Sequence, residues 1–137
     1  MGEVAAVVWG VTAAIGAFMF TRTVTGPRTA TGASPTALPS SLVFGHGSLA
    51  LASLAVWGIA WGYGNELIAW IGAAGLIGVI GGGSLLLVKW LGARRAHATG
   101  PGSTPYAEEQ IPVGVVLAHG VGALATVVLV VAANLAL

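Results

Sequence analysis

The sequence predicts an all-α fold, a bundle of four transmembrane helices made of two helical hairpins that repeat in parallel orientation. Three observations lead to this prediction. The chain of 137 residues is 56% hydrophobic and only 7% charged, whereas a soluble domain carries charge on about a quarter of its residues. Four uninterrupted apolar segments are long enough to cross a bilayer, which takes around 20 residues. Chemically distinctive residues of the first half also recur in the second half at a fixed spacing.

The four apolar segments are expected to be helices, because a helix satisfies all of its own backbone hydrogen bonds in lipid. They form one membrane domain that covers the whole chain, 1–137. The expected helices cover about residues 4–20, 41–62, 67–90 and 111–135.

The connections between these segments differ in character. Residues 21–40 and 92–110 are rich in Gly, Pro, Ser and Thr and are expected to be loops, while 62–66 is a tight turn. Pro39 and Pro112 stand at the entry of the second and fourth helices, where the missing N–H of proline does no harm.

The distribution of cationic residues predicts the orientation in the membrane. Four crossings put both termini on one side and the two long loops, 21–40 and 92–110, on the other. All five cationic residues lie on the side of the long loops: Arg22, Arg28, Lys89, Arg94 and Arg95. The positive-inside rule makes these loops cytoplasmic and both termini extracytoplasmic, in the inner (cytoplasmic) membrane of a bacterium. Trp57, Trp61 and Trp70 are expected to anchor the outer interface and Trp90 the inner one.

A shift of 73 residues aligns the two halves, about 1–64 and 65–137, without a gap. It superposes these pairs: Gly10 and Gly83, Arg22 and Arg95, Pro39 and Pro112, His46 and His119, Gly47 and Gly120. Matches of Arg, Pro and His at one common shift are informative, because these residue types are scarce here. Since each half crosses the membrane twice, the halves are expected to be parallel repeats about an axis along the membrane normal.

His46 and His119 are the main candidates for a functional site. Each follows its helix-entry proline by seven residues, about 10 Å along a helix, so both should lie at the same depth. Two imidazoles on facing helices are typical of the axial ligands of a b-type haem. Gly47 and Gly120 are expected to allow close approach of this cofactor. Small residues further along each helix could leave it room: Ala50, Ser53, Ala123 and Thr126.

A structural interpretation uses the same residues. Gly and Ala in membrane helices chiefly permit tight packing, and a histidine can hydrogen-bond across a helix interface. Glycines 75, 78 and 81–83 are better explained as a packing seam than as a cofactor slot. Two histidines are too few for a zinc or iron site of their own, and no acidic residue lies within a span to complete one.

The remaining polar residues indicate little chemistry. His97 is expected to be solvated in a basic loop, and Glu108 and Glu109 to interact with the N-terminal dipole of the fourth helix. The chain contains no Asp and no Cys, so the common hydrolytic and thiolate sites are excluded, and an enzyme is not expected. A net charge of +1 without a basic, aromatic-rich stretch gives no indication of nucleic-acid binding.

Three functions therefore stay open. The most specific is electron transfer through a haem b ligated by His46 and His119, with a quinone as a possible redox partner. The second is a non-catalytic accessory or assembly subunit of a larger membrane complex or a homo-oligomer. The third, a small transporter or channel protomer, is the least favoured, because no carboxylate is embedded in a span.

The segments EEQIPVGVVLAHGVGALATVVLVVAANLAL, FGHGSLALASLAVW and KWLGARR resemble a family of small four-helix membrane proteins of actinobacteria. The resemblance covers the second to fourth helices and rests on the PV..V.AHG pattern. It implies a membrane location and four spans, and it supplies no ligand or reaction. Helix count and paired histidines are also similar to those of cytochrome b membrane anchors, which is an analogy of architecture only.

Overall fold

The structure is a computed structural model that describes residues 1–25, 36–99 and 106–137, with side chains described through Arg95 in the second range. The described elements are helical, which confirms the all-α prediction. They are α1 (Gly2–Val24), α2 (Ser40–Gly62), α3 (Glu66–Thr99), the short 3₁₀ helix η1 (Ala107–Gln110) and α4 (Val113–Asn134).

Each of the four α-helices is long and apolar enough to cross a membrane, over residues 2–24, 40–62, 66–95 and 113–134. The protein is therefore a multi-pass membrane protein. Its helices are apolar on nearly all sides, as expected of segments whose surroundings are lipid rather than water.

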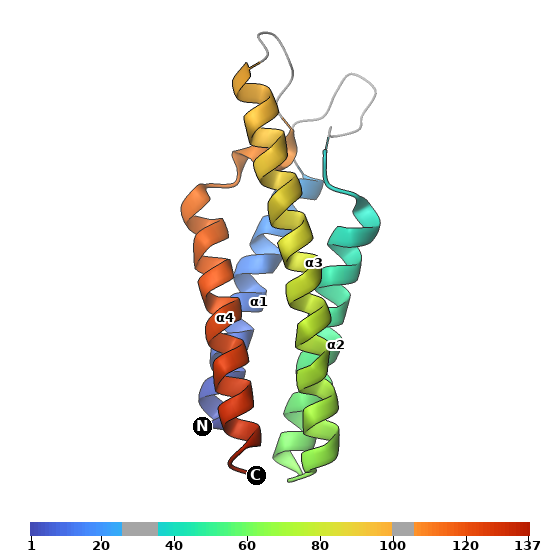
Figure 1. Ribbon diagram of the computed structural model, residues 1–137, viewed down its shortest axis with the longest axis vertical. Helices are drawn as coiled ribbons and strands as arrows, with labels where there is room; N and C mark the ends of the chain where they lie inside the picture. The colour runs from blue at the N-terminus through green and yellow to red at the C-terminus, as the bar shows by residue number, and fades with distance from the viewer. Residues whose placement is uncertain (26–35, 100–105) are drawn as a thin grey trace.

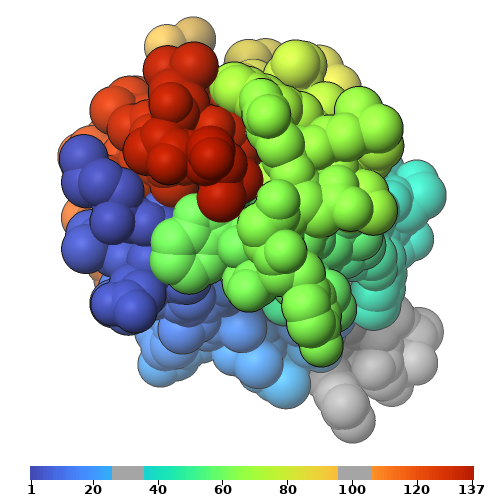
Figure 2. Space-filling view, turned by 90° about the horizontal axis from the view of Figure 1, so that it is seen from below, coloured from blue at the N-terminus to red at the C-terminus, as the bar shows by residue number. Residues whose placement is uncertain are grey.

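The helices run alternately up and down and stand at the corners of a square in the order α1, α2, α3, α4 (Figure 1). Packing is closest between α2 and α3 and between α1 and α4. We call one end of the bundle the terminal end: it carries both chain termini and the α2–α3 turn, which lie beside one another in Figure 2. The opposite end, where α1 ends, α2 and α4 begin and η1 lies, is the loop end.

The turn at the terminal end is built from three residues, 63–65. Gly64 has a φ of +68°, a left-handed conformation that glycine adopts without strain. The side chain of Asn65 accepts a hydrogen bond of 3.1 Å from the N–H of Ile68 and so caps the first turn of α3. This turn fixes α2 and α3 as antiparallel neighbours.

The helices differ from the sequence prediction mainly at the loop end. The predicted end of the third helix at residue 90 is wrong, because α3 continues to Thr99 through eight residues expected in a loop. This segment, GARRAHAT, is rich in Ala and Arg, which favour helix. Residues 107–110 of the same predicted loop form η1. Pro39 and Pro112 do precede α2 and α4 as expected, as their N-cap residues.

Trp57 and Trp90 do not lie where anchors at the interface would. Trp57 is fully buried between the helices, where its Nε1 donates a 2.8 Å hydrogen bond to Oδ1 of Asn134. Its ring packs on Trp9 and Trp61, with centres 5.9 and 6.1 Å away. The anchor prediction fails here because an all-apolar helix gives no signal of which side faces inward.

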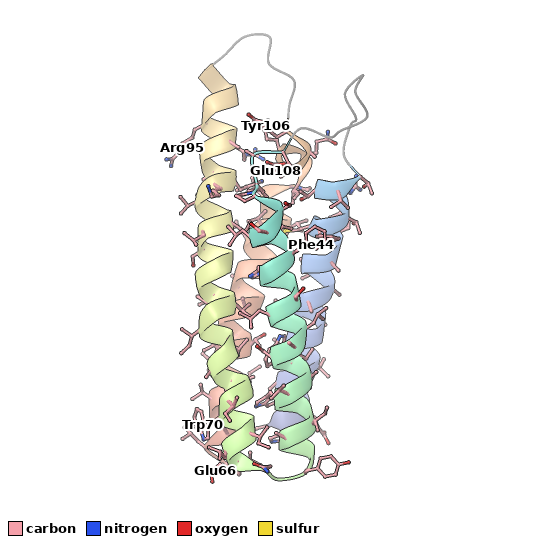
Figure 3. The ribbon with its side chains drawn as sticks, turned by 90° about the vertical axis from the view of Figure 1, so that its right-hand side faces the viewer. Phe44, Glu66, Trp70, Arg95, Tyr106 and Glu108 are labelled. Atoms are coloured by element: carbon pink, nitrogen blue, oxygen red, sulfur yellow. The ribbon has the colours of Figure 1, made fainter. Side chains whose placement is uncertain are left out.

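Glu108 organises the loop end (Figure 3). Its side chain is fully buried, and its Oε1 accepts a 2.6 Å hydrogen bond from the N–H of Ala37 in the α1–α2 connection. Its carbonyl accepts a 2.9 Å bond from Nε1 of the buried Trp90 on α3. Glu108 thus joins η1 to α3 and to the other connection. The predicted role at the dipole of α4 is wrong for this residue, because α4 begins only at Val113.

The buried positions of the two halves correspond at two different shifts. Between α2 and α4 the shift is 73: Ser53, Trp57 and Ala60 are buried, as are Thr126, Val130 and Ala133. Between α1 and α3 the shift is 67, which pairs Gly2, Ala5, Trp9, Thr12 and Thr23 with Ala69, Gly72, Leu76, Val79 and Trp90, all buried.

The gap-free shift of 73 therefore does not describe α1 and α3. The shifts of 67 and 73 mean that corresponding positions on the two helices are six residues further apart in the second half, where α3 is longer than α1. Gly16, rather than Gly10, corresponds to Gly83. A duplication of one hairpin stays a prediction from the sequence, but the structural correspondence defines which positions it would relate.

Candidate functional site

His46 and His119 lie next to each other inside the bundle, with their rings in an edge-to-face arrangement. They come from α2 and α4, which occupy diagonally opposite corners, and their ring centres are 6.2 Å apart with an angle of 69° between the ring planes. Each is the seventh residue of its helix. The juxtaposition and equal depth expected from the sequence are therefore present.

Each imidazole is seated on a third helix through one hydrogen bond. Nδ1 of His46 lies 3.0 Å from the carbonyl oxygen of Val79 on α3. Nδ1 of His119 lies 3.0 Å from the carbonyl oxygen of Thr12 on α1. A carbonyl oxygen can only accept, so Nδ1 carries the hydrogen in both rings and Nε2 keeps a lone pair. Within the described ranges, neither Nε2 has a hydrogen-bond partner.

A glycine lies against each ring. A Cβ added to Gly16 on α1 would come within 3.0 Å of Cε1 of His119, and one added to Gly83 on α3 within 3.1 Å of Cε1 of His46. Sequence reasoning missed Gly16 altogether. In the sequence, a glycine does follow each accepting carbonyl by four residues, but only the structure shows which carbonyls accept.

Gly47 and Gly120, which the sequence placed beside a cofactor, do not border the pair. Both are exposed, and a Cβ on either would meet no atom within 4 Å. The residue after each histidine points away because neighbours on a helix are about 100° apart around its axis. These two glycines face the surroundings of the bundle.

Two of the small residues beyond the histidines are engaged in packing and hydrogen bonding. Ser53 and Thr126 are buried, and a Cβ on Gly75 would overlap the Ser53 hydroxyl. The hydroxyl of Thr126 donates a 2.8 Å hydrogen bond to the carbonyl of Gly122 in its own helix. Gly75 thus belongs to the packing seam expected from the sequence, as does Gly78, where a Cβ would lie 2.8 Å from Cδ2 of Leu49.

The acidic residues in the described part of the chain belong to the two ends of the bundle. The carboxylates of Glu3 and Glu66 belong to the terminal end, and those of Glu108 and Glu109 to η1 at the loop end. Backbone carbonyls are therefore what orients the two rings. The side chain of His97 lies outside the described residues, so its predicted solvation is not tested.

Comparisons of the chain with protein-family models, curated proteins and solved structures found no match.

Proposed function

We propose that the protein is a membrane electron-transfer protein that holds one b-type haem between His46 and His119. The observation that carries the proposal is the facing pair of imidazoles with Nε2 lone pairs available. A metal atom bonded on a line to one nitrogen of each ring at about 2.1 Å would hold the ring centres roughly 6.5 Å apart. The observed separation of 6.2 Å is close to this value.

Three features favour haem over a bare metal ion. The described residues contain no group of three or more metal-ligating side chains, whereas haem iron needs only axial ligands from the protein. Histidine ligands characteristically donate their second ring N–H to a carbonyl or carboxylate, as both rings do here. At Gly16 and Gly83, α1 and α3, the two helices on the other diagonal, also present no side chain to the rings.

The residues of the chain would fix two properties of the bound haem. His46 and His119 would hold the haem iron, and the bound haem would supply one-electron transfer at this place in the membrane. The carbonyls of Thr12 and Val79 hold the rings in one tautomer, which would keep both Nε2 atoms available to a bound haem. A lipid-soluble quinone is the redox partner that a site within the membrane would serve.

An absorption spectrum of detergent-purified protein, made in cells supplied with a haem precursor, tests this proposal. We expect a b-type spectrum that sharpens on reduction with dithionite and is lost in His46→Ala and in His119→Ala. Gly47→Ala and Gly120→Ala, whose new methyl groups meet open space, are the matched controls and should keep the spectrum. A colourless wild-type protein would overturn the proposal and leave the histidines as a packing contact.

We further propose that the loop end faces the cytoplasm of a bacterium. The cationic residues within the described ranges, Arg22, Lys89, Arg94 and Arg95, lie toward this end, and basic residues flanking spans favour the cytoplasmic side.

The absence of cysteine gives this orientation a clean test. A membrane-impermeant maleimide added to intact spheroplasts should label Tyr63→Cys, at the exposed turn of the terminal end. It should label Thr25→Cys, next to the last residue of α1, only after lysis. The reverse pattern would invert the topology without affecting the haem proposal.

A further inference from the structure

The two histidines are held in the same way, each by a helix carbonyl whose surroundings lack a side chain; we call this carbonyl and the glycine beside it the seat of the histidine. In an α-helix the carbonyl of residue i bonds the N–H of residue i+4, and the side chain of residue i+4 leans back over the preceding turn. That side chain covers the surface around carbonyl i. Gly16 stands four residues after Thr12, and Gly83 four residues after Val79, so at both seats the covering side chain is missing.

The distances show that each ring fills the vacated space. A Cβ on Gly16 or Gly83 would lie 3.0 or 3.1 Å from Cε1 of the seated imidazole, closer than ordinary contact. Two glycines elsewhere on the same helices serve as a comparison: a Cβ on Gly10 of α1 or on Gly81 of α3 would meet nothing within 4 Å. Gly16 and Gly83 make the closest approach to an imidazole, since a Cβ on the neighbouring Gly82 would lie 3.5 Å from Nδ1 of His46, which is ordinary contact.

We propose that Gly16 and Gly83 are the positioning residues of the histidine pair. Each uncovers a helical carbonyl, which uses its second lone pair to accept the Nδ1 hydrogen of the imidazole. This selects the Nδ1–H tautomer in both rings and makes Nε2 the nitrogen that each presents to a ligand. The identity of the ligand rests on the proposed haem function, but the selection of the tautomer does not.

The assignment is crosswise between the halves of the chain. His46 belongs to the first hairpin and is positioned by Gly83 of the second, whereas His119 belongs to the second and is positioned by Gly16 of the first. A change at one glycine should therefore affect the histidine that is far from it in sequence and leave the other histidine unchanged.

Nitrogen-15 NMR of histidine-labelled protein in detergent micelles, without added haem, tests the proposal. The wild type should show the Nδ1–H tautomer at both His46 and His119. Gly83→Leu should lower the ratio of Nδ1–H to Nε2–H at His46 by about fivefold or more, the share that one hydrogen bond contributes, and leave His119 unchanged. Gly16→Leu should do the reverse. Gly10→Leu and Gly81→Leu, on the same helices, are the matched controls and should change neither ring.

The milder variants Gly16→Ala and Gly83→Ala keep the test decisive if a leucine variant fails to fold. A methyl group at these distances displaces the ring by only a few tenths of an ångström, which should weaken the bond without disrupting the bundle. Unchanged tautomers in both alanine variants would overturn the proposal, as would an equal change in the Gly10 or Gly81 controls.

The two proposals fail in different ways. Colourless protein with the expected tautomers would overturn haem binding and keep the positioning role. In a pigmented protein, the positioning role predicts a shifted midpoint potential in Gly16→Ala and Gly83→Ala but not in Gly10→Ala. If the protein binds haem but substitutions at Gly16 and Gly83 change neither the midpoint potential nor the histidine tautomers, the positioning role is overturned and haem binding is kept.

Discussion

The two halves of the chain are closely equivalent in the layer of the histidines, but they differ in side-chain type toward the terminal end. In the layer of the histidines, each half supplies one imidazole, one accepting carbonyl and one glycine, with equal bond lengths of 3.0 Å. Toward the terminal end the corresponding residues diverge, since Trp57 of α2 matches Val130 of α4 and Trp9 of α1 matches Leu76 of α3.

This difference shows that a binding site and a packed interior place different requirements on corresponding residues. Filling the interior requires only that the summed side-chain volumes fit, so one large tryptophan can oppose a valine. A ligand held symmetrically by two side chains requires both to be placed alike. We call the layer of Trp9, Trp57, Leu76 and Val130 the tryptophan layer. The equivalence of the halves is found in the histidine layer and is absent in the tryptophan layer, as expected if the two histidines act together.

Substitution of the central residue of the tryptophan layer should have the largest effect. Trp57→Ala is expected to lower the free energy of unfolding by about 3–5 kcal/mol, because it removes a large, fully buried side chain. Val130→Ala, at the corresponding position, should cost only about 1–2 kcal/mol. Reversible unfolding in mixed detergent micelles, followed by circular dichroism, measures both. Equal losses would contradict the asymmetry of this layer.

A methyl group added at Gly72 should come next. A Cβ there would lie 2.6 Å from the backbone nitrogen of Trp57, so α2 and α3 must separate, at a cost of about 2–3 kcal/mol. The corresponding position on α1 is Ala5, which already carries a methyl group and is buried. Gly58→Ala, with no atom within 4 Å, is the control. A Gly72→Ala variant as stable as this control would disprove the close contact.

The hydrogen bond between Trp57 and Asn134 should contribute less. Asn134→Ala leaves the buried Nε1 of Trp57 without its acceptor and is expected to cost about 1–2 kcal/mol. The same unfolding measurement applies. Thr126→Val is a suitable comparison, because its hydroxyl bonds only within its own helix. The prediction is wrong if loss of the Asn134 acceptor costs no more than loss of this hydroxyl.

The histidine layer should show the smallest and most even effects on stability. Without haem, His46→Ala and His119→Ala each remove one hydrogen bond to a helix carbonyl and should each cost about 1 kcal/mol. Because the seats match, the two values should agree to within about 0.5 kcal/mol, which is the usual error of additivity. Unequal losses would show that the two seats are not energetically equivalent.

The fold was predictable because lipid leaves few choices to the backbone. Long apolar segments must be helices, and the prolines at 39 and 112 mark where two of them begin. The meeting of His46 and His119 was also predictable, since helix entry and depth follow from counting residues along the chain.

Rotation about the helix axes was not predictable. An amphipathic helix reveals its buried side, but these helices are apolar all round, so the burial of Trp57 and the outward direction of Gly47 leave no trace in the pattern. Gly16 was missed because the gap-free shift of 73 paired Gly83 with Gly10. Burial of Glu108 depends on bonds to Ala37 and Trp90, which are distant in sequence.

The crosswise seating of the histidines has a consequence for biogenesis. As the chain enters the membrane from its N-terminus, His46 arrives before the helix that holds its acceptor, and the acceptor of His119 arrives long before His119 itself. The first hairpin alone therefore contains the imidazole of His46 without its acceptor on α3, and the carbonyl of Thr12 without its donor on α4. Insertion of α3 supplies the acceptor of His46, and insertion of α4 brings His119 to its own, so the two imidazoles are both positioned only when the whole bundle has assembled.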